Sequence, residues 1–265
     1  MFRNLFIILL ISLLSKPILS QQTHFNWPKG KTMGLSFTWD DGRDSQVLIG
    51  TPLLDKYGIK ATFYVIPSGV ERQLSNWKKA VASGHEIANH SLNHPCSGNF
   101  LWARKNALEE YSLAKMENEL QAANTKIKEL LGVEMTEFAY PCGQTFIGRG
   151  EKTQSYVPII AKNFNSGRTW MDEAPNDPAY CDLSQITGME MDGKDFEEIL
   201  KLIESAKKGN LWLVLAGHDI GQTAPQTTKT EMLEKLLQFL NTQSKEIWVA
   251  PVVEISKYIK SQRKI

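Results

Sequence analysis

The sequence predicts a barrel-like α/β domain of about seven parallel strands. From about Lys31 onward, short apolar runs alternate with helical patterns, which is typical of parallel strands joined by crossover helices. A chain of 265 residues is long enough for one large hydrophobic core and short for two, so we expect a single domain. An open doubly wound sheet is the competing architecture, because periodicity alone does not separate it from a barrel.

Seven segments are predicted as strands because each is a short run rich in apolar residues. Residues 211–216 are all apolar, as expected for a strand that is buried on both faces. The predicted strands are residues 33–38, 61–66, 86–88, 137–140, 165–169, 211–216 and 247–250.

Helical patterns fill the stretches between these strands. The longest runs from about residue 103 to residue 131, where apolar residues recur three and four positions apart and form one stripe. We interpret this stripe as core packing and not as a cofactor site. Further amphipathic helices are predicted at residues 195–207, 230–241 and 252–261.

The first twenty residues have the pattern of a secretory signal peptide. A short, positively charged start precedes an apolar run over residues 5–14, which is too short to span a bilayer, since about 20 apolar residues are needed. Small Ser20 is a candidate cleavage point. We therefore expect residues 1–20 to be removed and residues 21–265 to form a secreted or periplasmic domain with no membrane span. An uncleaved membrane anchor is the alternative.

The charge composition argues against a nucleic-acid partner. Lys and Arg total 30 against 29 for Asp and Glu, and no basic patch occurs, so the footprint of a nucleic-acid-binding protein is absent from the sequence. The three cysteines, Cys96, Cys142 and Cys181, allow one disulfide in an oxidising compartment. The sequence does not decide which pair forms it.

Polar residues follow three of the predicted strands, at the end where α/β folds place their active sites. Asp40 and Asp41 follow the first strand and precede a glycine. Adjacent residues on an extended backbone point in different directions, so one carboxylate can bind a metal while its neighbour faces a substrate. The alternative is a plain turn, because Asp-Gly is a strong turn signal.

The other two clusters contain histidines. His90 and His94 are four residues apart, a spacing that places both imidazoles on one face of a helical turn. Two imidazoles and one carboxylate form a ligand set suited to zinc or a similar divalent ion. His218 follows the fully apolar strand, which would bring it beside the other clusters. His85 precedes its strand, so we expect a structural role at the opposite end.

Four motifs occur in one order along the chain. They are Trp39-Asp40-Asp41-Gly42, His90-Ser91-Leu92-Asn93-His94-Pro95, Tyr140-Pro141-Cys142-Gly143 and the strand that ends in His218. In order and spacing they resemble the polysaccharide deacetylases, a carbohydrate esterase family that includes chitin, peptidoglycan and acetylxylan deacetylases. The resemblance covers roughly residues 33 to 255 and implies a distorted (β/α) barrel with an open groove.

The resemblance also implies a role for each matching residue. Asp40 would be the general base, and His218 the general acid that protonates the leaving group. The backbone N–H of Cys142 would help to hold the oxyanion. One divalent metal ion, for which zinc is expected, would be bound by Asp41, His90 and His94.

The sequence departs from the family pattern at two places. Ala139 stands where many members carry an arginine that orients the base. The motif that supplies an aspartate to the acid histidine and a tryptophan to the groove is not plainly present, and its candidates are Arg168, Trp170 and Asp172. We expect Arg168 to pair with Asp40 and Trp170 to lie in the groove. A surface position for Arg168 and a core position for Trp170 are the alternatives.

These inferences predict a metal-dependent hydrolase that removes N-acetyl or O-acetyl groups from a carbohydrate polymer and releases acetate. The expected partner is therefore an acetylated polysaccharide or oligosaccharide. One alternative is a non-catalytic carbohydrate-binding protein on the same barrel, and the other is a hydrolase of a small cyclic amide. Export favours the first reading, because polymers are met outside the cytoplasm.

Overall fold

The computed structural model describes residues 24–222 and 224–263, so the predicted signal peptide at residues 1–20 lies outside the described residues. Among the described residues, eight parallel strands form one sheet, in the order β7-β4-β3-β2-β1-β9-β8, with β12 paired to the first half of β1. These strands are β1 Met33–Asp40, β2 Thr62–Val65, β3 Glu86–Asn89, β4 Glu137–Ala139, β7 Ser166–Arg168, β8 Met189–Glu190, β9 Trp212–Gly217 and β12 Ile247–Val249.

The sheet curls into a distorted barrel, which confirms the predicted fold class. Its two edges approach each other through the segment that leads into β8. Ile186 pairs with Arg168 of β7, and Met189 pairs with Leu215 of β9. The Ile186 N–H donates to the carbonyl oxygen of Gly167 at 2.8 Å. The ring of strands is therefore closed by a few backbone pairs and not by a full-length strand.

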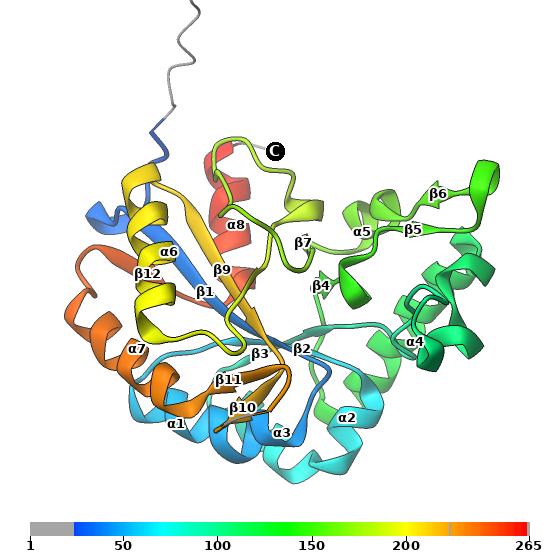
Figure 1. The fold of residues 1–265 in the computed structure, drawn as a ribbon, viewed down its shortest axis with the longest axis horizontal. Helices are drawn as coiled ribbons and strands as arrows, with labels where there is room; N and C mark the ends of the chain where they lie inside the picture. Colours follow the sequence, from blue (N-terminus) through cyan, green and yellow to red (C-terminus); the bar gives the residue numbers. More distant parts are fainter. Residues whose placement is uncertain (1–23, 223, 264–265) are drawn as a thin grey trace, which may run out of the picture.

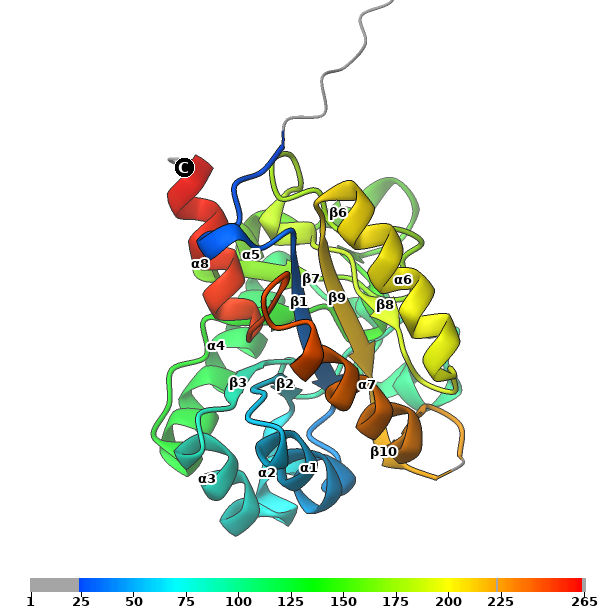
Figure 2. The ribbon, with the colours of Figure 1, turned by 90° about the vertical axis from the view of Figure 1, so that its left-hand side faces the viewer.

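Helices cover the outside of this sheet, as Figure 1 shows. Figure 2 shows β1 and β9 side by side, with α6 on one side of them and α8 on the other. The helices are α1 Thr51–Lys56, α2 Pro67–Arg72, α3 Leu74–Ala82, α4 Leu113–Leu131, α5 Val157–Asn163, α6 Phe196–Gly209, α7 Thr230–Thr242 and α8 Val252–Arg263.

The longest predicted helix begins later than expected. α4 starts at Leu113 and not near residue 103, because the Ser112 side chain caps it by accepting the Lys115 N–H at 3.2 Å. The preceding residues form two 3₁₀ turns, Leu101–Asn106 and Leu108–Glu110. The stripe on α4 does pack into the core, as predicted.

The alternation of side chains along β1 decides which face its carboxylate occupies. Phe37 and Trp39 point outward and stack at 5.9 Å in the core under the helices. Thr38 points the other way, and its hydroxyl donates to the Leu215 carbonyl oxygen at 2.8 Å. Because successive side chains alternate, Asp40 lies on the inner face with Thr38.

The remaining elements are two small sheets and several short helical turns. Two short sheets pair β5 Phe146–Ile147 with β6 Gln154–Ser155, and β10 Asp219–Gly221 with β11 Thr227–Lys229. Further 3₁₀ turns lie at Pro28–Gly30, Pro141–Gly143, Gly150–Lys152 and Leu183–Gln185, and one π turn at Gln46–Gly50. None of the helices in the described part of the chain is long and apolar enough to cross a membrane.

Candidate active site

One cavity of about 860 Å³ lies where the carboxyl ends of the barrel strands meet. The predicted site residues come to it from separate strands: the two aspartates from β1, the histidine pair from the loop after β3, and His218 from the end of β9. Predicted residues that line it are Asp40, Asp41, His90, His94, Cys142, Trp170 and His218.

Three of these residues converge on one point. The Asp41 Oδ1 atom lies 3.5 Å from His90 Nε2 and 3.3 Å from His94 Nε2. These distances exceed those of ordinary N–H···O hydrogen bonds. Ligand atoms about 2.1 Å from a tetrahedral ion would lie about 3.4 Å apart. The spacing of this donor set therefore fits one shared divalent ion.

Each imidazole of this set is oriented by its other nitrogen. His90 Nδ1 lies 2.9 Å from the Ala139 carbonyl oxygen, which can only accept, so Nδ1 carries the proton and Nε2 keeps its lone pair. His94 Nδ1 lies 3.7 Å from the Cys96 sulfur. Burial and the charge of His90 lower the pKa of His94 to about 4. Both rings therefore direct Nε2 toward Asp41, as ligation of one shared ion requires.

The turn that carries this pair is not helical, which corrects the sequence interpretation. Ser91 and His94 both have positive φ, at 67° and 49°. Asn89 Oδ1 accepts the Ser91 N–H at 2.6 Å, and the Ser91 hydroxyl oxygen accepts the His94 N–H at 2.9 Å. These local side-chain bonds replace helical ones and still bring the two rings to 4.7 Å.

Asp40 is held on the inner face of the barrel by Arg168. One guanidinium nitrogen, Nη2, donates to both carboxylate oxygens of Asp40, so the predicted pairing is present. The second nitrogen, Nη1, donates to the Thr169 carbonyl oxygen at 2.9 Å. Arg168 is only 1% exposed. It is therefore neither at the surface nor placed as a planar fork on the carboxylate, and Ala139 leaves room for it on the neighbouring strand, β4.

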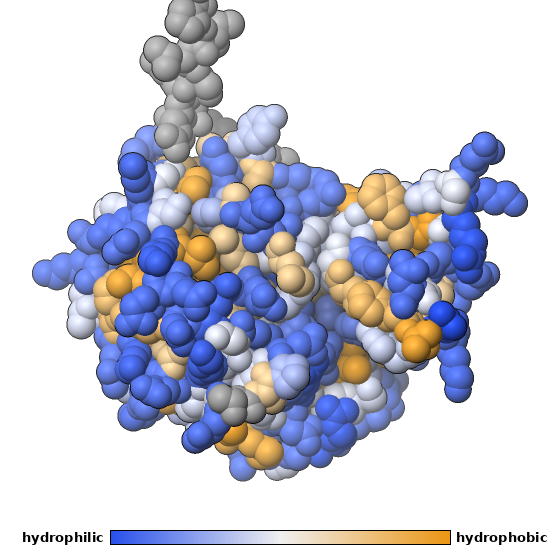
Figure 3. Space-filling model, viewed as in Figure 1, coloured by the Kyte–Doolittle hydropathy of each residue, from blue (hydrophilic) through white to orange (hydrophobic). Residues whose placement is uncertain are grey.

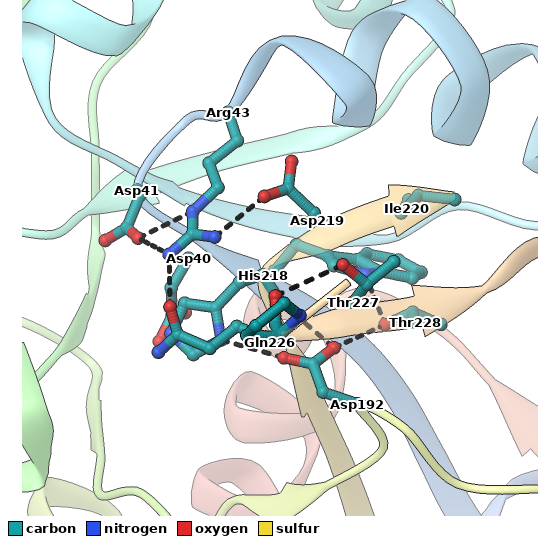
Figure 4. A network of polar contacts seen from close by, with 12 residues as sticks. Asp40, Asp41, Arg43, Asp192, His218, Asp219, Ile220, Gln226, Thr227 and Thr228 are labelled. Atoms are coloured by element: carbon teal, nitrogen blue, oxygen red, sulfur yellow. Dashed lines mark hydrogen bonds and ion pairs between the residues drawn. The ribbon is translucent and has the colours of Figure 1, made fainter. Parts of the chain in front are cut away.

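His218 is paired with Asp192, not with Asp172. His218 Nδ1 lies 2.9 Å from Asp192 Oδ2, and the Thr228 hydroxyl donates to the other Asp192 oxygen at 2.8 Å (Figure 4). Asp172 instead accepts from Thr169 and from the Gly188 N–H, which corrects the candidate for this role. The sequence gives no spacing signal for Asp192, which follows a two-residue strand.

The surroundings of His218 favour its charged form. Burial alone would lower the pKa of His218, but the hydrogen bond to Asp192 and the negative charges of Asp40, Asp41 and Asp192 outweigh it, so the pKa is raised. The Trp170 ring packs against the imidazole at 4.5 Å. Since Nδ1 is held by Asp192, Nε2 is the ring nitrogen available to a substrate. Trp170 lines the cavity and is not a core residue.

Arg43 is a further site residue that the sequence did not indicate, although it follows the first motif directly. Its guanidinium lies 2.9 Å from Asp41 Oδ2 and 2.7 Å from Asp219 Oδ2 (Figure 4). It also donates to Gln226 at 2.8 Å. By holding Oδ2 of Asp41, Arg43 leaves Oδ1 toward the two histidines.

A buried glutamine links the strands that carry the two candidate proton-transfer groups. The Gln46 side-chain amide donates to the Asp40 carbonyl oxygen at 2.5 Å and to the His218 carbonyl oxygen at 2.9 Å. It thereby fixes the ends of β1 and β9 relative to each other. No sequence pattern points to this residue.

A disulfide joins Cys96 to Cys142 and thereby links the histidine loop to the loop of the third motif. Cys142 is the second residue of a 3₁₀ turn and has φ of 55°. As one of the first residues of that turn, it has no acceptor for its N–H within the turn, and the residue lines the cavity. Cys181 is not in a disulfide.

His85 lies away from the cavity, as expected. Its Nδ1 accepts the Ala61 N–H at 3.2 Å, and its Nε2 lies 3.2 Å from Asp55 of α1. These contacts hold the start of β3 to neighbouring elements, so His85 has a structural position.

Comparisons with known proteins relate this chain to polysaccharide deacetylases. Residues 23–153 match the family model for polysaccharide deacetylase. A gellan lyase from Bacillus sp. is 24% identical over 251 residues, which is 88% of this chain and 10% of that protein. The peptidoglycan-N-acetylglucosamine deacetylase PgdA of Listeria monocytogenes is 37% identical over 70 residues, covering 26% of this chain and 15% of that protein.

The fold is shared with solved structures. A candidate polysaccharide deacetylase from Mycobacterium smegmatis superposes with a TM-score of 0.66 at 17% identity, covering 90% of this chain and 94% of that one. The chain spans only 10%, 25% and 38% of the length of the first curated relatives that it matches. By its family match over residues 23–153 and by its fold, this chain resembles the polysaccharide deacetylases.

Proposed function

We propose that this protein is a metal-dependent deacetylase that removes acetyl groups from a carbohydrate polymer and releases acetate. The observation that carries the proposal is the convergence of Asp41, His90 and His94 beside Asp40 and His218 in one cavity. A ligand set, a carboxylate base and a paired histidine acid are the parts that acyl hydrolysis through water requires. The match of residues 23–153 to the polysaccharide deacetylase family model supports the same reaction class.

Asp40 supplies the base in this proposal. Arg168 fixes both of its oxygens, so the carboxylate cannot swing toward His90, whose Nε2 lies 3.9 Å from Asp40 Oδ2. A carboxylate held beside the ligand set is positioned to take the proton of an attacking water.

His218 and Cys142 act on the other parts of the acetyl group. His218 is oriented by Asp192 so that Nε2 can donate a proton to the departing amine or hydroxyl. Cys142 lines the cavity, and in this proposal its N–H donates to the oxygen that becomes negative in the tetrahedral intermediate. No covalent enzyme intermediate is needed, and neither disulfide-bonded cysteine is a nucleophile.

The residues of this chain that would hold the ion are Asp41, His90 and His94. A divalent ion there, for which we propose zinc, would polarise the acetyl carbonyl and lower the pKa of a bound water. Each of the three side chains has a second contact on its other polar atom. Asp41 contacts Arg43, His90 contacts the Ala139 carbonyl oxygen, and His94 contacts the Cys96 sulfur. Such second contacts keep a metal site in one geometry.

We also propose that the protein acts outside the cytoplasm, as a secreted or periplasmic enzyme after cleavage near Ser20. The disulfide Cys96–Cys142 supports this location, because disulfides persist in oxidising compartments. In this proposal, residues 21–265 form the deacetylase domain.

Acetate release tests the function directly. The purified protein is stripped with a chelator, and acetate is measured on acetylated xylan, chitooligosaccharide and peptidoglycan with and without added zinc. We expect release from one of these polymers that depends on the metal. His94→Ala should lose stoichiometric metal binding together with activity. Equal metal content in His94→Ala and the wild type would contradict the ligand assignment.

The same assay separates the alternatives. A non-catalytic carbohydrate-binding protein would bind one of the polymers and release no acetate from any. A hydrolase of a small cyclic amide would leave all three polymers unchanged and open the ring of the small substrate. The exposed aromatic side chains of Phe100 and Trp102 along the cavity favour a sugar chain over a small ring.

A further inference from the structure

An apolar surface lies on the loop that follows the histidine pair. In this loop, residues 96–110, the side chains of Phe100, Leu101 and Trp102 are 43%, 73% and 62% exposed. The rings of Phe100 and Trp102 stack at 5.5 Å, and Trp102 lies 5.8 Å from the His94 ring. Phe100 and Trp102 line the cavity, whereas Leu101 does not.

The loop that presents these rings is firmly built. The disulfide ties Cys96 to the third motif, and Gln144 accepts the Ser97 N–H at 2.7 Å. Glu109 accepts from the Gly98 N–H at 2.9 Å and from the Ser97 hydroxyl at 2.7 Å. Contiguous apolar side chains that stay exposed to water on an ordered loop are typical of binding surfaces, because their exposure costs free energy.

Apolar residues from a second loop also line the cavity. Trp170 and Met171 line it from the loop after β7, and Met171 is 64% exposed. Figure 3 shows the face hollowed between two lobes, with hydrophobic side chains gathered on the lobe that carries β5 and β6. The polar residues Asp40, Asp41 and His218 line the same cavity.

We propose that Trp102, supported by Phe100, is a stacking platform for a pyranose ring of the substrate chain, next to the ring that carries the acetyl group. A pyranose presents C–H groups on its faces and hydroxyls at its edge. Its face therefore matches an aromatic ring, and its edge matches the polar cavity floor. The platform rests on the proposed function for its substrate class, but it is a separate binding element.

Kinetics on substrates of two sizes test the platform. KM and kcat are measured for zinc-loaded wild type, Trp102→Ala and Trp102→Phe on N-acetylchitopentaose, on acetylated xylopentaose and on 4-nitrophenyl acetate. We expect Trp102→Ala to raise KM about tenfold for the pentasaccharide that the wild type deacetylates. The loss on 4-nitrophenyl acetate should be smaller than the loss on the pentasaccharide, and Trp102→Phe should retain most of the affinity.

Leu101→Ala is the matched control, because Leu101 belongs to the same loop and is as exposed but does not line the cavity. It should leave KM unchanged for every substrate. Equal losses in Leu101→Ala and Trp102→Ala, or an equal loss on the pentasaccharide and on 4-nitrophenyl acetate, would overturn the platform.

Calorimetric binding of both pentasaccharides separates this inference from the proposed function. Binding that Trp102→Ala weakens about tenfold, without acetate release by the wild type, would retain the platform and reject the deacetylase. Acetate release with a KM that Trp102→Ala does not change would retain the deacetylase and reject the platform. Absence of both binding and release would reject both.

Discussion

Asp40 and Arg168 form a buried ion pair whose two members depend on each other. Both side chains are at most 5% exposed, so each charge needs the other in place of water. In the proposed mechanism, this pairing holds the base beside the ligand set in a chain that has Ala139 where the family pattern has an arginine. The guanidinium comes from β7, the neighbour of the strand that carries Ala139, and reaches the same carboxylate.

Asp40→Asn should reduce kcat by about a hundredfold to ten-thousandfold, because an amide cannot accept the proton of the attacking water. It should also lower the melting temperature, since Arg168 would keep a buried charge without a counter-charge. Both are measured against Asp55→Asn, which removes a carboxylate that does not line the cavity. Turnover near that of the wild type in Asp40→Asn would show that Asp40 is not the base.

Asp192 sets the protonation of His218, and the pH profile reports it. An acid must be protonated, so activity falls as pH rises through the pKa of His218. Since Asp192 raises that pKa, Asp192→Asn should move the basic limb of kcat/KM to lower pH. Asp172→Asn is the matched control and should leave the limb in place. An unmoved limb in Asp192→Asn would contradict the assignment.

At the level of elements, periodic patterns were predictable and short irregular ones were not. All seven predicted strands are present, because apolar runs such as β9 have no other stable location than the core. β8 has only two residues and carries no period, and Asp192, which lies just after it, was missed for the same reason. The candidate Asp172 was chosen by chain position, which does not report the tertiary contact.

The motifs predicted that Cys142 and the histidine loop belong to the site, but they did not predict the disulfide that joins the two loops. Sequence allowed any pair of the three cysteines, whereas the fold brings the Cys96 and Cys142 loops together at the ends of β3 and β4. Similarly, the four-residue spacing of the histidine pair indicated closeness correctly and the helical turn wrongly. Local hydrogen bonds of Asn89 and Ser91 decided that geometry.

The disulfide should stabilise both loops and the barrel. It closes a loop with a sequence separation of 46, for which chain entropy predicts a contribution of about 4 kcal/mol to the free energy of unfolding. The double variant Cys96→Ala with Cys142→Ala should therefore unfold at lower urea concentration and lose activity, because the Cys142 N–H and His94 are no longer tied. Cys181→Ala controls for thiol removal. An unchanged unfolding midpoint in the double variant would contradict this.

The molecule as a whole has a polar barrel interior, which extends below the active site. Glu86 of β3 and Glu137 of β4 start their strands inside the barrel, close enough for their charges to interact. Glu137 is fully buried, and Glu86 is half-buried with its Oε1 atom enclosed. Hydroxyl groups hold them: Thr62 donates to Glu86 at 2.6 Å, and Ser166 donates to Glu137 at 2.5 Å. The barrel therefore holds two carboxyl groups that accept hydrogen bonds from neutral hydroxyl groups.

These carboxyl groups should make stability depend on pH. Burial and the charge of Glu137 raise the pKa of Glu86 to about 8. Burial raises the pKa of Glu137 to about 7. The positive charges of Lys257 and Lys260 on α8 oppose the shifts of Glu86 and Glu137, respectively. In the unfolded chain both groups lose their protons near 4.5. Between about pH 5 and pH 8 the folded protein therefore binds more protons than the unfolded one, so stability falls as pH rises, by on the order of a few kcal/mol.

Glu86→Gln removes one of these protonation equilibria and mimics the neutral acid in shape. We expect its melting temperature to exceed that of the wild type at pH 8 to 9 and to differ little at pH 5, which gives a flatter curve between these values. Thermal unfolding of the wild type, Glu86→Gln and the exposed control Glu134→Gln across this range measures the slopes. The control should follow the wild type, because Glu134 is exposed and its charge is screened by water. If Glu86→Gln also kept the slope of the wild type, the buried pair would not be the source of the pH dependence.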